Sequence, residues 1–484
     1  MALASLNCST SRPLRVAVPA AVMWFRRDLR LRDNPALLAA SKHGPVLALF
    51  VLDPVLVKSA GRARLGFLFE SLRCLDEDIA QRGGRLTVRF GPPWRVVPEV
   101  AREAGAASVH ITADFGPYGA KRDARVAKAL APVPLIATGS PYAVSPGALR
   151  GPSGEPYRVY SAFARAWRSH GWPPPVDSDR AVARWLSLAG EPLPSGTELC
   201  KGLSLPVPGE RAAAEAWERF RQSGLKSYAM SRDRLDLDKT SRLSAYLKFG
   251  QLHPRTLLAH ARQAGLDEGA ERFVSELAWR EFYAAVLAYW PKSAWEPFRP
   301  EAGAVKWRCD DELFAAWAQG RTGYPLVDAG MRQLSTEAWV HNRARMVVAS
   351  FLVKDLHLDW RLGARHFMEH LVDGDLASNQ HGWQWVAGTG TDAAPYNRIF
   401  NPVLQARRFD PEGNYVRRWV PELRGLSTQE LFEPWERPGG PPPGYPLPVV
   451  DHQAARNEAL SMYRASTLSR LSRHPKLRSD IESS

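Results

Sequence analysis

The sequence predicts an α/β domain built on a parallel, doubly wound sheet, followed by an all-α domain. Between residues 16 and 145, short apolar runs alternate with amphipathic stretches of helical spacing, which is the rhythm of consecutive βαβ units. From about residue 216 the pattern changes to long helical periods with few β-branched runs. A helical domain is therefore expected over residues 216–470.

The elements of the first domain follow from the same pattern. Strands are expected where apolar runs are short, at residues 16–25, 46–53, 85–90, 108–113 and 134–139. Helices are expected between them, at residues 64–83 and 118–131. No Gly-x-Gly-x-x-Gly motif follows the first strand, so the dinucleotide-binding fingerprint is absent.

Three further segments lie outside the two domains. Residues 146–215 are rich in Pro, Gly and Ser, and so long a connector is expected to wrap one domain and join the other. Residues 1–15 are expected to form a disordered overhang, although their acid-free composition also suits a transit peptide. Residues 471–484 are expected to form a loose basic tail.

The composition of the chain narrows the classes of function that it can have. The chain has 484 residues and a net charge of +14, which favours a polyanionic partner such as DNA, although a solvated basic surface would give the same balance. Cys8, Cys74, Cys200 and Cys309 lie far apart, as reduced thiols of an intracellular protein do, and they predict no metal site. No apolar run reaches the length that spans a bilayer. A cytoplasmic monomer is expected, with organelle targeting left open.

Long motifs of the second half carry the strongest signal. Residues 373–401 place Trp383 and Trp385 behind a turn rich in glycine and amides, where Gly374 and Gly382 permit close approach to a planar cofactor. This segment resembles the flavin-and-lesion segment of the DNA photolyase and cryptochrome family. Further matching segments are residues 240–250, 275–283, 320–334 and 339–346. The resemblance extends from Trp24 to about Trp435 and is greatest to class I cyclobutane pyrimidine dimer photolyases.

The resemblance implies a fold, an activity and a cofactor. The helical domain should bind FAD, and the function should be light-driven repair of pyrimidine dimers in DNA. The enzyme would be a deoxyribodipyrimidine photo-lyase in which excited FADH⁻ passes an electron to a flipped-out dimer. Damaged DNA is then the partner, and neither a metal nor a nucleophile is required.

The same resemblance implies a flavin site. Successive hydroxyls and N–H groups in residues 240–244 suit the flavin diphosphate at a helix start, although an ordinary N-cap is the alternative. Asn379 matches the position that faces flavin N5, and an uncharged amide there is compatible with an anionic reduced flavin. The expected cofactor-binding residues are Tyr228, Thr240, Ser241, Arg242, Leu243, Ser244, Arg345, Asp373, Gly374, Asp375 and Asn379.

A lesion pocket is expected beside the flavin. Glu276, Trp279, Arg280 and Tyr283 are spaced by three and four residues, so they share one helical face, although Glu276 and Arg280 alone would suggest a simple ion pair. By resemblance, Trp279 stacks on the dimer, Glu276 bonds its base edge, and Arg280 meets a DNA phosphate. The expected lesion- and DNA-binding residues are Arg232, Glu276, Trp279, Arg280, Tyr283, Asn342, Arg343, Met346, Trp385 and Gln405.

Three indoles match the family's electron-transfer chain from the flavin to the surface, namely Trp383, Trp360 and Trp307. Each alone would be interpreted as a core residue. With Glu276 and Asn379 they form the expected catalytic set. His381 stands where many relatives carry another residue, which makes it a candidate for altering the electrostatics around the flavin.

Two further features allow alternatives. The arginine-rich segment 24–37 suits either a DNA contact or a structural turn paired with Asp28 and Asp33, and the structural role is favoured. Asp114 and Lys248 resemble the antenna site of members that bind an 8-hydroxy-deazaflavin rather than methenyltetrahydrofolate. The alternative for Lys248 is a lysine that solvates its own helix.

Other functions stay open at this stage. A cryptochrome-type photoreceptor would share the fold and the flavin, but the residues of the dimer pocket favour repair. Repair of (6-4) photoproducts is disfavoured, because that pocket relies on histidines where this chain has Asn342 and Met346. A helical nucleic-acid binder without photochemistry would lack bound flavin.

Overall fold

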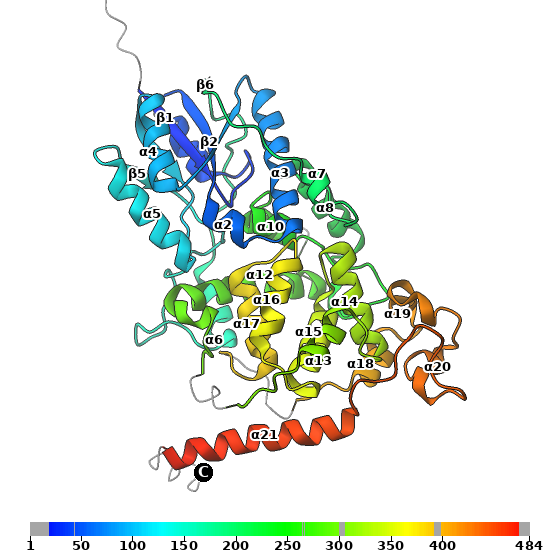
Figure 1. Cartoon of the computed structure of the whole chain (residues 1–484). Coiled ribbons are helices and arrows are strands. Elements are labelled where there is room, and N and C mark those ends of the chain that lie inside the picture. Colours follow the sequence, from blue (N-terminus) through cyan, green and yellow to red (C-terminus); the bar gives the residue numbers. More distant parts are fainter. Residues whose placement is uncertain are drawn as a thin grey trace, which may run out of the picture.

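The computed structural model describes residues 19–473, apart from residues 43, 264, 266, 300–304 and 392–397 and the side chains of residues 465–473. The expected overhang at residues 1–15 and most of the expected tail lie outside the described residues. Figure 1 shows the sheet domain above and a larger helical body below.

A parallel sheet forms the core of the first domain. Its five main strands run in the order β3-β2-β1-β4-β5, so the chain reverses its direction of travel across the sheet between β1 and β4. The strands are β1 (Ala20–Phe25), β2 (Val46–Leu52), β3 (Leu86–Phe90), β4 (Ala106–Ile111) and β5 (Leu135–Ala137). Alternate residues of β1 enter two different apolar clusters, one on each face of the sheet. This two-sided burial explains why the strands are uniformly apolar.

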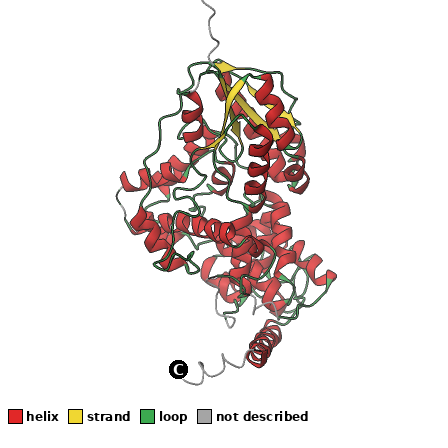
Figure 2. Ribbon diagram, turned by 90° about the vertical axis from the view of Figure 1, so that its left-hand side faces the viewer, coloured by secondary structure: helices red, strands yellow, loops and turns green. Residues whose placement is uncertain are grey.

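Helices cover both faces of this sheet (Figure 2). Those on one face are α1 (Pro35–Ser41) and α3 (Arg62–Ala80), and those on the other are α4 (Pro93–Glu103) and α5 (Pro117–Leu130). A short helix α2 (Pro54–Ser59) follows β2. The parallel, doubly wound domain predicted from the sequence is confirmed, and α3 and α5 lie within three residues of the predicted helices.

The connector carries structure of its own. It contains α6 (Tyr160–His170), β6 (Trp185–Leu186), α7 (Gly196–Leu199) and α8 (Glu210–Ser223). β6 adds a sixth strand that pairs in parallel with β2. A Cβ on Gly66 of α3 would meet the Gly196 carbonyl oxygen at 2.7 Å, so α7 lies directly on α3. The connector therefore packs against the sheet domain as well as leading away from it.

The rest of the described chain is helical. Its longer helices are α11 (Pro254–Gln263), α12 (Glu268–Tyr289), α13 (Asp311–Ala318), α14 (Pro325–Glu337), α15 (Asn342–Ser350), α16 (Trp360–His370), α17 (Leu376–Ala387), α18 (Pro402–Phe409) and α21 (His452–Arg473). Shorter ones are α9 (Tyr228–Ser231), α10 (Ser244–Phe249), α19 (Asn414–Trp419) and α20 (Thr428–Leu431). The predicted all-α domain is thus confirmed, and α21 extends along its lower side (Figure 1).

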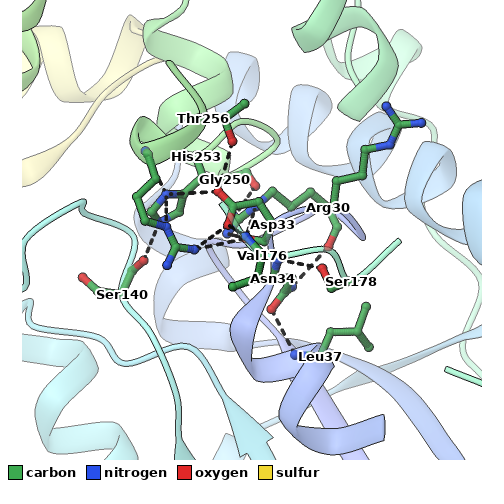
Figure 3. Close-up of polar contacts among 12 residues, drawn as sticks. Arg30, Asp33, Asn34, Leu37, Ser140, Val176, Ser178, Gly250, His253 and Thr256 are labelled. Carbon is green, nitrogen blue, oxygen red and sulfur yellow. Dashed lines mark hydrogen bonds and ion pairs between the residues drawn. The ribbon is translucent and has the colours of Figure 1, made fainter. Parts of the chain in front are cut away.

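A buried polar cluster joins the two domains (Figure 3). Arg30 donates to the carbonyl oxygens of Asp33 and Gly250, at 2.7 and 2.8 Å. The Asp33 carboxylate accepts from Arg255 at 2.6 Å and from Thr256 at 3.0 Å. The arginine-rich segment therefore has the structural role that the sequence favoured, since Arg30 is turned into the interface and is 3% exposed.

Candidate active site

A cavity of about 580 Å³ lies within the helical domain, between α10, α12, α15 and α17. Most of the residues that the sequence assigned to flavin and lesion line this single space. They are Tyr228, Arg232, Ser241, Leu243, Ser244, Glu276, Trp279, Arg280, Tyr283, Asn342, Arg345, Met346, Asp373, Gly374, Asp375, Asn379 and Trp385. Trp383 of the predicted electron-transfer chain and Lys248 of the predicted antenna site line it as well. Thr240, Arg242, Arg343, Gln405, Trp307, Trp360 and Asp114 are not part of its lining.

One face of α12 supplies a wall of the cavity. Its predicted members Glu276, Trp279, Arg280 and Tyr283 all line the space, as the spacing of three and four residues requires. Glu276 forms an ion pair with Arg232 and not with Arg280. The simple i,i+4 pair that the sequence allowed is therefore wrong.

Arg280 is anchored to two main-chain carbonyls. Its guanidinium donates to the carbonyl oxygens of Pro141 and Leu247, both at 3.1 Å, and lies 4.7 Å from the ring centroid of Tyr142. Arg280 also lines the cavity, and these two bonds leave other N–H groups of its guanidinium uncommitted. Arg280 is therefore a brace of the cavity wall, and its predicted contact with a DNA phosphate stays a prediction.

Asp373 presents an unsatisfied acceptor at the cavity. Its Oδ2 accepts from Arg345 at 2.8 Å, as the sequence predicted, whereas its buried Oδ1 has no hydrogen-bond partner. The side chain is 3% exposed, so the missing partner is not bulk water. Because an unpaired buried acceptor is costly, this atom calls for a ligand that offers an N–H or O–H donor.

Both carboxylate oxygens of Asp375 have protein partners, unlike those of Asp373. Its Oδ1 caps α17 by accepting from the Ser378 N–H at 3.1 Å, and its Oδ2 accepts from Arg27 of the first domain at 2.8 Å. Lys248 Nζ lies 3.8 Å from the same Oδ2. Burial alone would raise the pKa of Asp375, but Arg27 and Lys248 outweigh it and hold that pKa well below its usual range.

Lys248 lines the cavity and faces the carboxylate of Asp375. Burial, reinforced by repulsion from Arg27, lowers the pKa of Lys248 to about 7, while Asp375 opposes that decrease. Lys248 lines the cavity and Asp114 does not, so the structure does not bring this predicted antenna pair into one pocket. Arg27 interacts electrostatically with both, and Lys248 also interacts electrostatically with Asp114.

The predicted diphosphate segment is only partly directed into the cavity. Ser241, Leu243 and Ser244 line it at the start of α10. The Arg242 side chain leaves it, because its guanidinium pairs with Asp238 at 2.8 Å and with Glu337 at 3.1 Å. Any contribution of Arg242 to a ligand in this cavity is therefore limited to its backbone.

The amide of Asn379 is oriented by two acceptors. Its Nδ2 donates to the Ala364 carbonyl at 3.0 Å and to Gln380 Oε1 at 2.8 Å. Both N–H groups are thereby committed, so what Asn379 offers to a cavity ligand is its carbonyl oxygen. An acceptor at this position suits a ligand N–H.

His381 does not line the cavity itself, and its expected effect on the electrostatics around the flavin stays a prediction. The ring is 1% exposed and is not part of the cavity lining. It lies within hydrogen-bond distance of the Ala377 carbonyl oxygen, 2.7 Å, and of Ser293 Oγ, 2.9 Å. Burial lowers its pKa to about 4, so it stays neutral near pH 7 and adds no charge beside the cavity.

Of the other residues that the sequence predicted to contact the lesion, three line the cavity and two do not. Asn342, Met346 and Trp385 line the cavity, and Asn342 Nδ2 lies 3.9 Å from Met346 Sδ. Arg343 is withdrawn, because it pairs with Asp233 at 2.8 Å and lies over the Phe409 ring at 4.3 Å. Gln405 lies on α18 outside the lining, with a buried Oε1 that has no partner.

The three relay indoles differ in burial. Trp383 lines the cavity and is 3% exposed, Trp360 is fully buried, and Trp307 is half-buried. A Cβ on Gly363 would meet Trp383 at 2.1 Å, so Trp383 packs directly on the first turn of α16, the helix that Trp360 opens. The sequence did not single out Trp317, whose ring contacts Trp383 edge-on at 6.1 Å.

In the first domain, Asp114 lies beyond the carboxyl end of β4. Burial opposes its ionisation, but Arg27 and Arg122 hold its pKa below the ordinary value. A Cβ on Gly119 would meet the Asp114 carboxylate at 2.1 Å, so the glycine gives this side chain its space. Tyr118 donates to Asp53, beyond the end of β2, at 2.5 Å.

Sequence reasoning missed Arg27 and several lining residues. Arg27 lies 348 positions from Asp375, and no local pattern connects them. Ser378, which also lines the cavity, was missed as well, and its position three residues after Asp375 was the available signal. Other lining residues not assigned to the site are Leu247, Arg272, Phe273, Ala349, Phe367, Leu371 and Val386.

Two searches of the described residues bear on other site types. They contain no group of three or more His, Cys, Asp or Glu side chains that could hold a metal ion. Within the same residues, none of the helices is long and apolar enough to cross a membrane.

Comparisons with known proteins agree with this arrangement. A family model described as DNA photolyase matches residues 21–180, and one described as the FAD binding domain of DNA photolyase matches residues 273–465. The deoxyribodipyrimidine photo-lyase of Streptomyces griseus is 43% identical over 90% of this chain and 97% of its own length. That of Thermus thermophilus is 42% identical over 92% of this chain and 98% of its own length.

Solved structures give the same result. A class III photolyase from Agrobacterium tumefaciens superimposes with a TM-score of 0.87 at 36% identity, covering 95% of this chain and all of its own. A Sulfolobus tokodaii photolyase with two FAD molecules has a TM-score of 0.80 at 30% identity, covering 92% of this chain and all of its own. A Synechocystis cryptochrome has a TM-score of 0.84 at 26% identity, covering 92% and 99%.

Proposed function

The chain belongs to the DNA photolyase family, and we propose that it is a deoxyribodipyrimidine photo-lyase that repairs cyclobutane pyrimidine dimers in damaged DNA with light. The observation that carries this proposal is a single cavity lined both by the flavin-type residues and by the dimer-type residues. Trp279, Trp385, Asn342 and Met346 share that cavity with Asp373 and Asn379. A site that held only the flavin would not need the first four.

FAD is the cofactor of the matched domain, and the cavity residues fit it. Ser241 and Ser244 would hold its diphosphate, and Asp373 Oδ1 would accept one of its N–H or O–H groups. When bound in the reduced form, FAD supplies an electron to the dimer under light. The Asn379 carbonyl oxygen would face an N–H of that reduced ring.

The charges around the cavity suit an anionic cofactor. The three carboxylates of the lining, Glu276, Asp373 and Asp375, are each paired with a cation, namely Arg232, Arg345 and Arg27 respectively. Lys248 and Arg280 add further positive charge to the lining. The cavity wall is therefore not net negative at this point, and the charge of a reduced flavin and its diphosphate meets cations rather than repulsion.

The residues on the lesion side recognise shape and stacking. Trp279 and Trp385 supply aromatic walls for a flipped-out dimer, and the Glu276 carboxylate supplies an acceptor for a base edge. A dimer stacks badly in the duplex, so flipping it out costs less than flipping an intact pyrimidine. The difference contributes selectivity before any specific contact is formed.

A relay through Trp383, Trp360 and Trp307 would return electrons to an oxidised flavin. Its support is the burial gradient, from Trp383 in the cavity wall to half-buried Trp307, together with the packing of Trp383 on α16. Indoles are the side chains best suited to this role, because they are large, aromatic and readily oxidised.

We infer an antenna chromophore of the 8-hydroxy-deazaflavin type at the carboxyl ends of β1, β2 and β4. Ligands of open parallel sheets bind at such ends, where the strand order reverses, and this sheet reverses between β1 and β4. Asp114 beside Tyr118 supplies a carboxylate there for the hydroxyls of a ribityl chain. Reconstitution tests it: bound deazaflavin should extend the action spectrum, whereas binding of folate or a second FAD alone would contradict the assignment.

The protein is further proposed to act as a monomer in the cytoplasm, on DNA. Its charge of +14 supports association with a polyanion. Sedimentation of the holoprotein with and without a dimer-containing duplex tests the stoichiometry, and a dimeric species at micromolar concentration would contradict it.

The deciding experiment is illumination of the reduced holoprotein with an oligonucleotide that contains one thymine dimer. Recovery of two intact thymines, dependent on light, is the expected result. A flavoprotein that is photoreduced but leaves the dimer intact would support a cryptochrome-type photoreceptor instead. Repair of a (6-4) photoproduct alone would contradict the pocket assignment.

A further inference from the structure

The connector reaches the cavity wall from behind. Tyr160, the first residue of α6, places its ring parallel to the indole of Trp279, with the ring centroids 3.6 Å apart and the planes inclined by 6°. The Tyr160 hydroxyl donates to the Ser275 carbonyl oxygen at 2.9 Å, one turn before Trp279 on α12. Phe282 contacts the Tyr160 ring edge-on at 5.9 Å.

This stack determines which face of the Trp279 indole is available to a ligand. At a centroid distance of 3.6 Å and an inclination of 6°, the tyrosine ring occupies one face of the indole as a stacking partner. Only the opposite face is left for a stacking partner, and Trp279 lines the cavity. The hydroxyl bond to Ser275 ties the tyrosine to the same helix, so ring and indole keep their relative position if α12 shifts as a unit.

The two residues after Trp279 are also held from outside the helical domain, by Pro141 and Val144 at the end of the first domain and by Trp167 of the connector. Arg280 donates to the Pro141 carbonyl, and the buried Glu281 accepts from the N–H of Val144 at 3.0 Å and from the indole N–H of Trp167 at 2.6 Å. Three consecutive positions of α12, two of which line the cavity, are therefore braced from outside the helical domain. Of these braces, the tyrosine is the one that acts on a predicted stacking surface.

We propose that Tyr160 is a positioning residue for dimer recognition, which holds the indole of Trp279 with its free face towards the cavity. The inference rests on the proposed function, because the stacking partner of that free face is the flipped-out dimer. Preorganising an aromatic wall improves binding by removing the cost of ordering it in the complex. The effect should therefore act on damaged DNA and leave undamaged DNA, which does not enter the cavity, unaffected.

The test compares binding in the dark, so it does not depend on turnover. The holoprotein variants Tyr160→Ala, Tyr160→Leu and Tyr160→Phe are titrated with a duplex that carries one thymine dimer and with the same duplex undamaged. An aromatic pair is worth roughly two- to tenfold in an equilibrium constant. Tyr160→Ala and Tyr160→Leu should each lower the preference for the dimer by about that factor, and Tyr160→Phe, which keeps the ring, should restore most of it.

Two controls separate positioning from a general loss of structure. Tyr157→Ala removes another half-buried connector tyrosine, whose ring packs edge-on against Phe163 of α6 rather than on Trp279, and it should leave the preference unchanged. In a Trp279→Ala background, Tyr160→Ala should cause no further loss, because the residue through which it acts is gone. Melting temperatures of all variants are measured alongside, and Tyr160→Leu retains side-chain bulk if Tyr160→Ala fails to fold.

The outcomes are distinguishable. Unchanged preference in Tyr160→Ala or Tyr160→Leu, or an equal loss in the Trp279→Ala background, would overturn the positioning role while leaving repair intact. An equal loss in Tyr157→Ala would make the effect one of connector stability and would also overturn it. A wild-type protein without preference for the dimer would instead overturn the proposed function and, with it, this inference.

Discussion

Replacing Asp373 by asparagine tests the assignment of the cavity to FAD most directly. The carboxylate is 3% exposed, with one oxygen paired to Arg345 and the other buried without a partner. Asparagine has nearly the same shape but only one acceptor oxygen. If that oxygen stays with Arg345, the cavity meets an N–H donor where it had an acceptor.

The magnitude follows from the lost hydrogen bond. A hydrogen bond to a charged group contributes about 1.5–3 kcal/mol, which corresponds to roughly 10- to 150-fold in a dissociation constant. The protein without flavin should not lose stability in the same proportion, because the unpaired oxygen of Asp373 already costs it free energy. We therefore expect weaker FAD binding by that factor, together with an apoprotein melting temperature that is unchanged or slightly higher.

The assay titrates the apoprotein with FAD and follows the flavin fluorescence, while circular dichroism gives the melting temperature. Asp238→Asn is the matched control, because Asp238 is largely exposed, pairs with Arg242 and lies outside the cavity lining. Its FAD affinity should match that of the wild type. Unaltered FAD affinity in Asp373→Asn would refute the argument that the orphaned oxygen meets the cofactor.

Three further predictions use the same structure. Trp383→Phe should block photoreduction of oxidised flavin but leave repair by chemically reduced protein largely intact; normal photoreduction would exclude Trp383 from the relay. Trp279→Ala should cost about 1–3 kcal/mol of stacking for dimer-containing DNA only, while the steep decrease of affinity with salt, set by counterion release, should persist; an equal loss for undamaged DNA would contradict the pocket. Burial lowers the pKa of His381 to about 4 from an ordinary 6.5, so its contribution to stability is complete above pH 6.5 and is lost as the pH falls towards 4. Between pH 7.5 and 4.5, His381→Gln should therefore lose about 2 kcal/mol less stability than wild type in urea unfolding, and identical pH profiles would contradict a buried neutral ring.

The fold could be predicted because its signals are local. Strands buried on both faces leave short apolar runs, and α3 and α5 leave helical periods that a sequence displays directly. α1 and α2 are too short to show a period, and α4 begins at Pro93 and contains Pro98, which suggests a loop. β6 consists of two residues, so only its pairing with β2 reveals it.

The candidate site likewise has a part that the sequence predicts and a part that only the tertiary structure reveals. Glu276, Trp279 and Tyr283 were predictable, because helical spacing fixes which residues share a face. The partners of Arg280 and Arg242 were not, because a guanidinium takes whichever acceptor the tertiary structure places within reach. For Arg280 these are main-chain carbonyls, and for Arg242 they are Asp238 and Glu337, none of which the sequence could rank.

Arg27 shows why the cavity is not a property of the helical domain alone. It donates to Asp375 at 2.8 Å across the domain boundary, and it interacts electrostatically with Asp114 on its own side. Burial opposes the ionisation of Asp375, and Arg27 is the largest of the charges that outweigh it. A helical domain without its partner would keep Lys248 but lose that guanidinium, and the pKa of Asp375 would rise. The α/β domain thus helps to set the charge of the cavity wall, which is a physical reason for the two domains to be joined by a buried polar interface rather than by a flexible linker.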